Sequence, residues 1–188
     1  AVALVQTLTI NDGSGTDLTN NNTVTVNGTL DLAGTVSGNA LTYGGSSTLQ
    51  YGNSIAQTAT ATEWPSSASP ANVSFTGGGN VLLPVTPFSR TISGDLNIGT
   101  ILFSIFGNTV TVGGNVLGST GSVAGSGKIS MTGASKTISI SQCSGLQTNA
   151  TIDLGASLTI TGDLDVVSTK TFALSTFRAT LPVLAIGS

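Results

Sequence analysis

The chain has few charged residues and no histidine. Only 7% of its 188 residues are charged, with five Lys and Arg residues, eight Asp and Glu residues and a net charge of −3. An average globular protein carries about 25% charged residues. So few basic residues cannot form the positive surface that nucleic-acid binding needs, and the usual general base of nucleophilic catalysis is missing. We therefore expect neither a nucleic-acid partner nor an enzyme.

Cysteine and long apolar runs are also scarce. Cys143 is the only cysteine, so no internal disulfide can form, and we expect a small buried side chain within ISISQCSG. No stretch approaches the roughly 20 apolar residues of a spanning helix, so we expect no membrane span. The first ten residues, AVALVQTLTI, lack the charged start of a signal peptide, and we expect any export signal to have been removed.

The abundant residues are those of strands and tight turns. The 25 glycines occur among Ser, Thr, Asn, Val, Ile and Leu. β-Branched side chains fit a pleated surface, and Gly and Asn accept the backbone angles of turns. This composition predicts an all-β protein.

One phrase occurs four times along the chain. TVTVNGTLDL begins at Thr23, TISGDLNI at Thr91, TVTVGGNVLG at Thr109 and LTITGDLDV at Leu158. In each copy apolar and polar residues alternate, which is typical of a half-buried strand. The predicted core residues are Val24, Val26, Leu30, Leu32, Ile92, Leu96, Ile98, Val110, Val112, Leu158, Ile160, Leu164 and Val166.

A glycine interrupts the apolar face of each copy. Gly28, Gly94, Gly114 and Gly162 lie where an apolar side chain is expected, which indicates two short strands joined at a corner with no room for a Cβ atom. Their spacing fits multiples of about 20–24 residues, the length of one rung of a β-solenoid. We therefore predict a single β-solenoid domain over residues 1–188, or a segment of a longer repeat protein. The four glycines should then line up along the solenoid axis.

Residues 58–71, TATATEWPSSASPA, interrupt the pattern. Pro65 and Pro70 cannot donate ladder hydrogen bonds, so we predict a loop that leaves the coil here. Trp64 is expected to cover the edge of the core. The alternative is that its ring stacks on a sugar, with Glu63 beside it.

The segments QTATATEWPSSASPANVSFTGGGNVLLP and RTISGDLNIG resemble secreted, adhesin-like surface proteins of Bacteroidetes-type bacteria. The resemblance covers about residues 48–120 well and the remainder by repeat style. It implies an exported β-solenoid or β-rich stalk and no reaction. No C-terminal sorting domain of that family is recognisable, which leaves the export route open.

Two clusters of oxygen-bearing side chains could carry chemistry. Asp163 and Asp165 share one face of a strand at about 7 Å, a separation that a glycosidase pair could use, although solvent-facing strand residues are the favoured interpretation. NDGSGTD at 11–17 could wrap Ca²⁺ through Asp12, Ser14, Thr16 and Asp17, but a plain turn is favoured. We therefore assign no catalytic, cofactor-binding or metal-binding residue and no cofactor.

These observations favour a structural protein of the cell surface or extracellular space. The chain would be part of a fibre, stalk or adhesin, with copies of itself as partners and a glycan or cell-surface ligand as a further partner. Two alternatives remain open. One is a carbohydrate-binding or carbohydrate-cleaving β-helix. The other is a β-sandwich pilin that polymerises by donating residues 1–10 as a strand.

Overall fold

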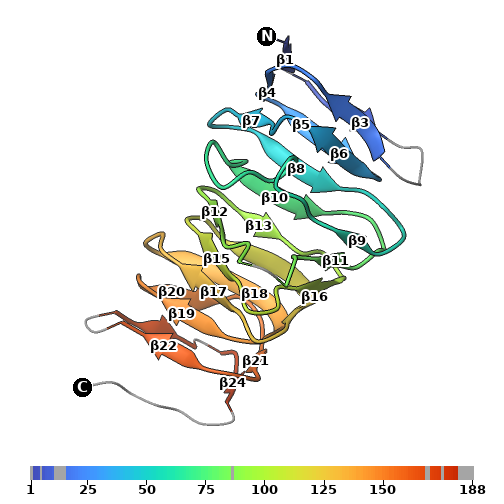
Figure 1. Cartoon of the computed structure of the whole chain (residues 1–188). Helices are drawn as coiled ribbons and strands as arrows, with labels where there is room; N and C mark the ends of the chain where they lie inside the picture. The colour runs from blue at the N-terminus through green and yellow to red at the C-terminus, as the bar shows by residue number, and fades with distance from the viewer. Residues whose placement is uncertain are drawn as a thin grey trace.

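The chain forms one continuous stack of β-strands (Figure 1). In the computed structural model, residues 2–4, 6–10, 16–85, 87–167, 170–174 and 176–181 are described. The described residues hold only strands and connections, with β1 at one end of the stack and β24 near the other. Among them is no helix long and apolar enough to cross a membrane.

Over these ranges the turns of the chain lay strands on three faces in the same order, except that the turn with residues 59–71 has no strand on the first face. The first face carries β1 (Val2–Leu4), β4 (Val24–Val26), β7 (Thr42–Tyr43), β12 (Arg90–Ile92), β15 (Thr109–Val112), β17 (Lys128–Met131), β19 (Leu146–Thr148) and β22 (Leu164–Val166). The second carries β2 (Leu8–Ile10), β5 (Thr29–Leu32), β8 (Thr48–Tyr51), β10 (Asn72–Phe75), β13 (Leu96–Asn97), β20 (Ile152–Leu154) and β23 (Phe172–Ala173). The third carries β3 (Thr16–Asn20), β6 (Thr35–Gly38), β9 (Gln57–Thr58), β11 (Val81–Leu82), β14 (Leu102–Ser104), β21 (Leu158–Ile160) and β24 (Ala179–Thr180).

Two long strands bend from the second face to the third. The start of β16 (Val116–Ala124) pairs with β13 and its end with β14. The start of β18 (Lys136–Cys143) pairs with β20 and its end with β21. The register between β16 and β18 shifts between Gly118 and Ser122, where the strands turn this corner.

The described part of the chain makes about eight turns of a β-solenoid, which confirms the predicted fold class. Every pairing in it is parallel, from β1 on β4 to β21 on β24. The β-sandwich alternative is therefore wrong. The donated strand is wrong as well, because β1 and β2 pair with β4 and β5 of their own chain.

The length of a turn varies more than the predicted 20–24 residues. Leu49 pairs with Val73, 24 residues later, whereas Lys136 pairs with Ile152 after only 16. A solenoid tolerates this variation because only the strands must stay in register, and the corners can gain or lose residues.

The predicted core residues line the interior of the solenoid. Those that are at most 7% exposed are Val26, Leu30, Leu32, Ile92, Leu96, Ile98, Val110, Val112, Leu158, Ile160 and Leu164. Val24 and Val166 are only partly buried and pack against this core. The expectation for Cys143 is also confirmed. Its thiol is fully buried, donates to the Gly145 carbonyl at 2.9 Å, and has its pKa raised by burial to about 12.

Three of the four phrase glycines share one corner, and the fourth does not. Gly114 N donates to Gly94 O at 2.8 Å, and Gly94 N to Ala71 O at 2.7 Å. In the registers of β10 with β8 and of β8 with β5, the position of Ala71 corresponds first to Ser47 and then to Gly28. Gly28 therefore lies at the same corner as Gly94 and Gly114. Gly162 instead lies on the corner between β21 and β22, above Ser144. The predicted common axis is therefore wrong for Gly162, because the phrase encodes strand, corner and strand, and a three-faced coil has several such corners.

An Asn or Asp side chain at this corner connects one turn to the next. Asn72 Oδ1 accepts the Asp95 N–H at 2.9 Å, Asp95 Oδ1 accepts the Asn115 N–H at 2.7 Å, and Asn115 Oδ1 accepts the Thr137 N–H at 3.0 Å. A side chain thus satisfies a backbone donor that the bent chain leaves without a ladder partner. This explains the Asp95 that follows Gly94 and the Asn115 that follows Gly114.

Replacement of the corner glycine should destabilise the protein. A Cβ atom at Gly114 would overlap the backbone of Gly94, whereas one at Gly78 would meet nothing within 4 Å. We expect Gly114→Ala to lower the free energy of unfolding by about 2 kcal/mol, measured by urea denaturation. Gly78→Ala is the matched control and should leave it unchanged. Equal stability of the two variants would contradict the close approach of the turns.

Candidate functional site

The segment predicted to loop out contains a closed turn that faces the core. No strand lies between β9 and β10, which agrees with the two prolines. Glu63 Oε1 accepts the Thr60 N–H at 2.6 Å, Glu63 Oε2 accepts the Thr60 hydroxyl, and Trp64 N donates to Thr60 O at 3.1 Å. The bond from the Thr60 N–H to the Glu63 carboxylate is one half of a capping box, here around a single turn.

The turn places Trp64 inside the solenoid. The indole is 0% exposed and stacks on Phe103 at 6.4 Å between ring centroids. Phe103 contacts Phe75, and Phe75 contacts Tyr51, at 4.9 and 5.6 Å between centroids. Trp64 therefore fills the core and does not cover its edge.

Arg90 and Tyr43 hold this segment from the first face. Arg90 Nε donates to the Trp64 carbonyl at 2.6 Å, and its guanidinium lies 3.4 Å from the centroid of the Phe88 ring. Tyr43 donates its hydroxyl proton to the Glu63 carbonyl at 2.5 Å. The missing first-face strand between β7 and β12 is thus replaced by these side-chain contacts and by two backbone hydrogen bonds, from Leu41 N to Thr62 O at 2.9 Å and from Tyr43 N to Ala68 O at 3.0 Å. These residues were missed at the sequence level, although TATE carried the capping-box signal.

Burial changes the acidity of this cluster. Glu63 is 0% exposed, and its desolvation raises the carboxyl pKa from 4.5 to about 6, against the hydrogen bonds from Thr60. Burial, and next the charge of Glu63, raise the pKa of Tyr43 and Tyr51 well above its usual value. Neither the Glu63 carboxylate nor the Trp64 ring is exposed to a ligand in this structure, so the arrangement holds the fold together.

The stability of the protein should fall as Glu63 ionises. Its folded pKa of about 6 lies above the ordinary 4.5. Stability is therefore complete below pH 4.5 and is lost as the pH rises through 6, by about 2 kcal/mol. Glu63→Gln keeps both bonds to Thr60 and should remove this decrease, as measured by urea denaturation at pH 4 and pH 8. Asp153→Asn on β20, which removes an exposed carboxyl, should keep the parent's decrease. An unchanged slope in Glu63→Gln would contradict the assignment.

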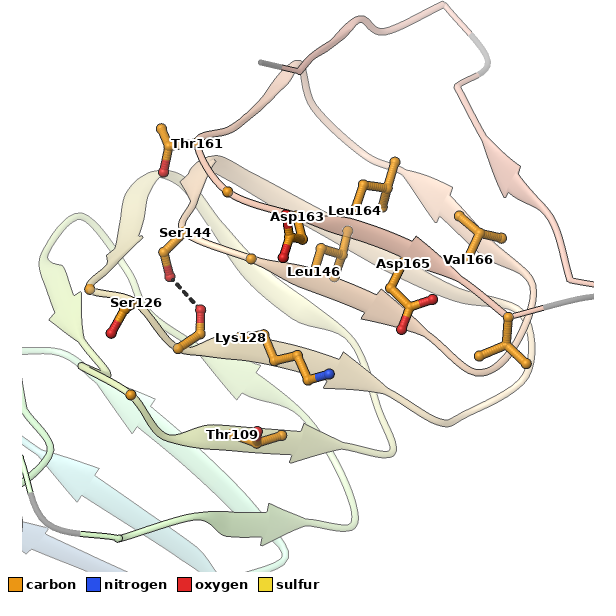
Figure 2. A pocket seen from close by; sticks show the side chains of 16 residues that line it. Thr109, Ser126, Lys128, Ser144, Leu146, Thr161, Asp163, Leu164, Asp165 and Val166 are labelled. Carbon is orange, nitrogen blue, oxygen red and sulfur yellow. Dashed lines mark hydrogen bonds between the residues drawn. The ribbon is translucent and has the colours of Figure 1, made fainter. Parts of the chain in front are cut away.

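The outer surface carries a second arrangement, an open groove of about 1020 Å³ (Figure 2). It crosses four turns where the third face meets the first. Its polar side chains are Thr109, Ser126, Lys128, Ser144, Thr161, Asp163 and Asp165. Glycines 107, 125, 127, 145 and 162 also line it, so much of its surface is backbone.

The structure brings the predicted pair Asp163 and Asp165 into this groove. Both are exposed on the strand end around β22, as expected for solvent-facing strand residues. Asp165 Oδ2 accepts a hydrogen bond from Gln147 Nε2 at 2.8 Å. Lys128, which the sequence phrase gave no reason to place near them, lines the same groove two turns earlier.

The metal hypothesis for residues 11–17 is only partly within the described structure. Residues 11–15, with Asp12 and Ser14, lie outside the described residues, and Thr16 and Asp17 begin β3. Elsewhere in the described ranges, no three Cys, Asp or Glu side chains gather as they would around a metal ion.

Comparisons of the chain with protein-family models, with curated proteins and with solved structures give no match. The likeness to bacterial surface proteins therefore stays a prediction from the quoted motifs. The function has to be argued from the stacked turns, their edges and the groove.

Proposed function

We propose that the chain is a rigid structural element of an extracellular fibre, stalk or adhesin of the cell surface, and that copies of it associate through β-stacking. The observation that carries this proposal is the parallel ladder itself. On the second face it runs without a break from β2 to β13 and on through β16, β18 and β20 to β23. Such a ladder resists bending and local opening because each strand is held from both sides.

The ends of the ladder support association. In the described part of the chain, β22, β23 and β24 each pair with one strand, and so do β1, β2 and β3 at the other end. An edge strand presents unpaired N–H and C=O groups that can accept another strand. Both ends have the same parallel direction, so a second copy can continue the ladder head to tail.

The outward side chains also suit contact between copies. The outward row on the first face holds Thr111 and Gln147, which are uncharged and partly exposed. Ser130 between them is buried, and the row ends at the exposed carboxylate of Asp165. A surface with few charges gives little electrostatic repulsion between copies. The proposed role is non-enzymatic, since the carboxyl with the raised pKa, Glu63, is buried in the core and Asp163 and Asp165 lie in a groove several turns away.

A proline at the free edge should block association while the turns stay folded. Leu158 N donates to Arg178 O. Because alternate N–H groups of a strand point to opposite neighbours, the N–H of Ala179 points away from β21, to the side on which β24 has no partner strand among the described residues. We expect the parent protein to form filaments or concentration-dependent oligomers in electron microscopy and analytical ultracentrifugation. Ala179→Pro should be monomeric with an unchanged circular dichroism spectrum.

Ala179→Ser is the matched control, because it keeps the N–H group, and it should assemble like the parent. A parent protein that stays monomeric at all concentrations would contradict the proposal. So would an Ala179→Pro variant that assembles as well as the parent.

A further inference from the structure

The groove exists because one turn of the solenoid has a shorter corner than its neighbours. Between the third and first faces, residues 105–108 connect β14 to β15, and residues 125–127 connect β16 to β17. Residues 161–163 connect β21 to β22, but only residues 144–145 connect β18 to β19. A shorter connection lies closer to the axis, so this corner is recessed between its neighbours. In Figure 2, Ser144 lies between Ser126 and Thr161.

The floor of the recess is a position without a side chain between two opposite charges. The registers β15–β17, β17–β19 and β19–β22 place Thr109, Lys128, Gly145 and Asp163 in one outward row. Neighbouring strands are about 4.8 Å apart, so the Cα atoms of Lys128 and Asp163 are about 10 Å apart across Gly145. A ligand lying on Gly145 would reach both side chains.

The adjoining row is already ordered by hydrogen bonds. Gln147 Nε2 donates to Asp165 Oδ2 at 2.8 Å. Ser130 Oγ donates to Gln147 Oε1 at 3.3 Å and accepts from Asn149 Nδ2 at 2.9 Å. Ser144 Oγ donates to the Gly127 carbonyl at 3.0 Å, which fixes the floor. Groups held in this way lose little conformational entropy when a ligand binds.

We propose that this groove binds a neutral carbohydrate chain, with Lys128, Asp163 and Asp165 hydrogen-bonding to its hydroxyl groups. Hydroxyl groups donate to carboxylates and accept from ammonium groups, so both signs of charge serve one neutral ligand. An anionic chain would meet the two carboxylates, and a cationic one would meet Lys128. The groove volume of about 1020 Å³ accommodates several sugar residues, and backbone glycines allow their rings to approach closely.

Carbohydrate binding in this groove does not require that copies of the chain associate, although their association would strengthen the binding of a long polysaccharide. An open groove that binds through a few solvent-exposed polar contacts gives weak affinity for a single chain. A fibre would repeat the groove at regular intervals along one line, and a polysaccharide that engages several copies would gain avidity.

The test is to titrate the monomeric Ala179→Pro variant and the parent protein with maltohexaose, mannohexaose and cellohexaose. Binding is monitored by the amide chemical shifts in NMR spectra. At least one of these hexasaccharides should shift the resonances of Gly127, Gly145 and Gly162, with weak, saturable binding. In each background, Asp163→Asn combined with Asp165→Asn should weaken that binding at least about tenfold, through the loss of charge-assisted hydrogen bonds. Asp153→Asn, which removes an exposed carboxyl on another face, should leave it unchanged.

Three results would overturn the proposal. One is the absence of shifts with all three hexasaccharides. Another is shifts centred away from the groove, or binding that survives the double Asp variant. The third is binding of an oligogalacturonate alone, lost in Lys128→Gln, which would identify an anionic ligand. None of these outcomes bears on filament formation by the parent protein, so the two proposals fail separately.

Discussion

The structure depends on the requirement that each turn satisfy the backbone hydrogen bonds of the next. With almost no long charged side chains to cover irregular surfaces, the chain satisfies its peptide groups by parallel stacking, from Leu8 on Leu30 to Leu158 on Ala179. The apolar rows follow from this register, since like residues stand above like residues. Where the chain bends and the ladder is broken, Asn72, Asp95 and Asn115 supply the missing acceptors. Corners without a Cβ atom allow the turns to come this close.

The interruption at residues 58–71 shows how the same requirement is met without strands. This turn is long, as the 24 residues from Gln57 to Val81 show. Its additional residues form a capped turn, and the place of the missing first-face strand is taken by Trp64 packing and by the Arg90 hydrogen bond to the Trp64 carbonyl. The cost is a buried carboxyl, Glu63, whose ionised form is disfavoured. The interruption thus replaces one strand of a turn, whose other two strands, β10 and β11, stay in register with β8 and β9.

The sequence predicted the strands and their inward faces because alternation needs only neighbouring residues. It predicted the corner glycines for the same reason. It misplaced Gly162, because the repeated motif predicts a corner between two strands but does not predict which of the corners of the turn this is. It also misjudged Trp64: two prolines correctly exclude a strand, but whether a loop points inward depends on space left by Phe103 and Phe75, which lie on other turns. The groove could not be predicted from the sequence, because the register of three strands brings Lys128 and Asp163 into one row.

The length of each turn then explains where the solenoid has additional core side chains and where it has a groove on its surface. The strands must stay in register, so inserted or deleted residues appear at corners, where they can be accommodated in one of two directions. In the longest turns the additional residues fold inward and fill the core with Trp64. In the short turn at residues 144–145 the chain is drawn inward, and the space appears outside, bounded by the longer corners at Ser126 and Thr161. In this solenoid the concave surface therefore lies at the shortest of these corners, and side chains of both charges line the same recess.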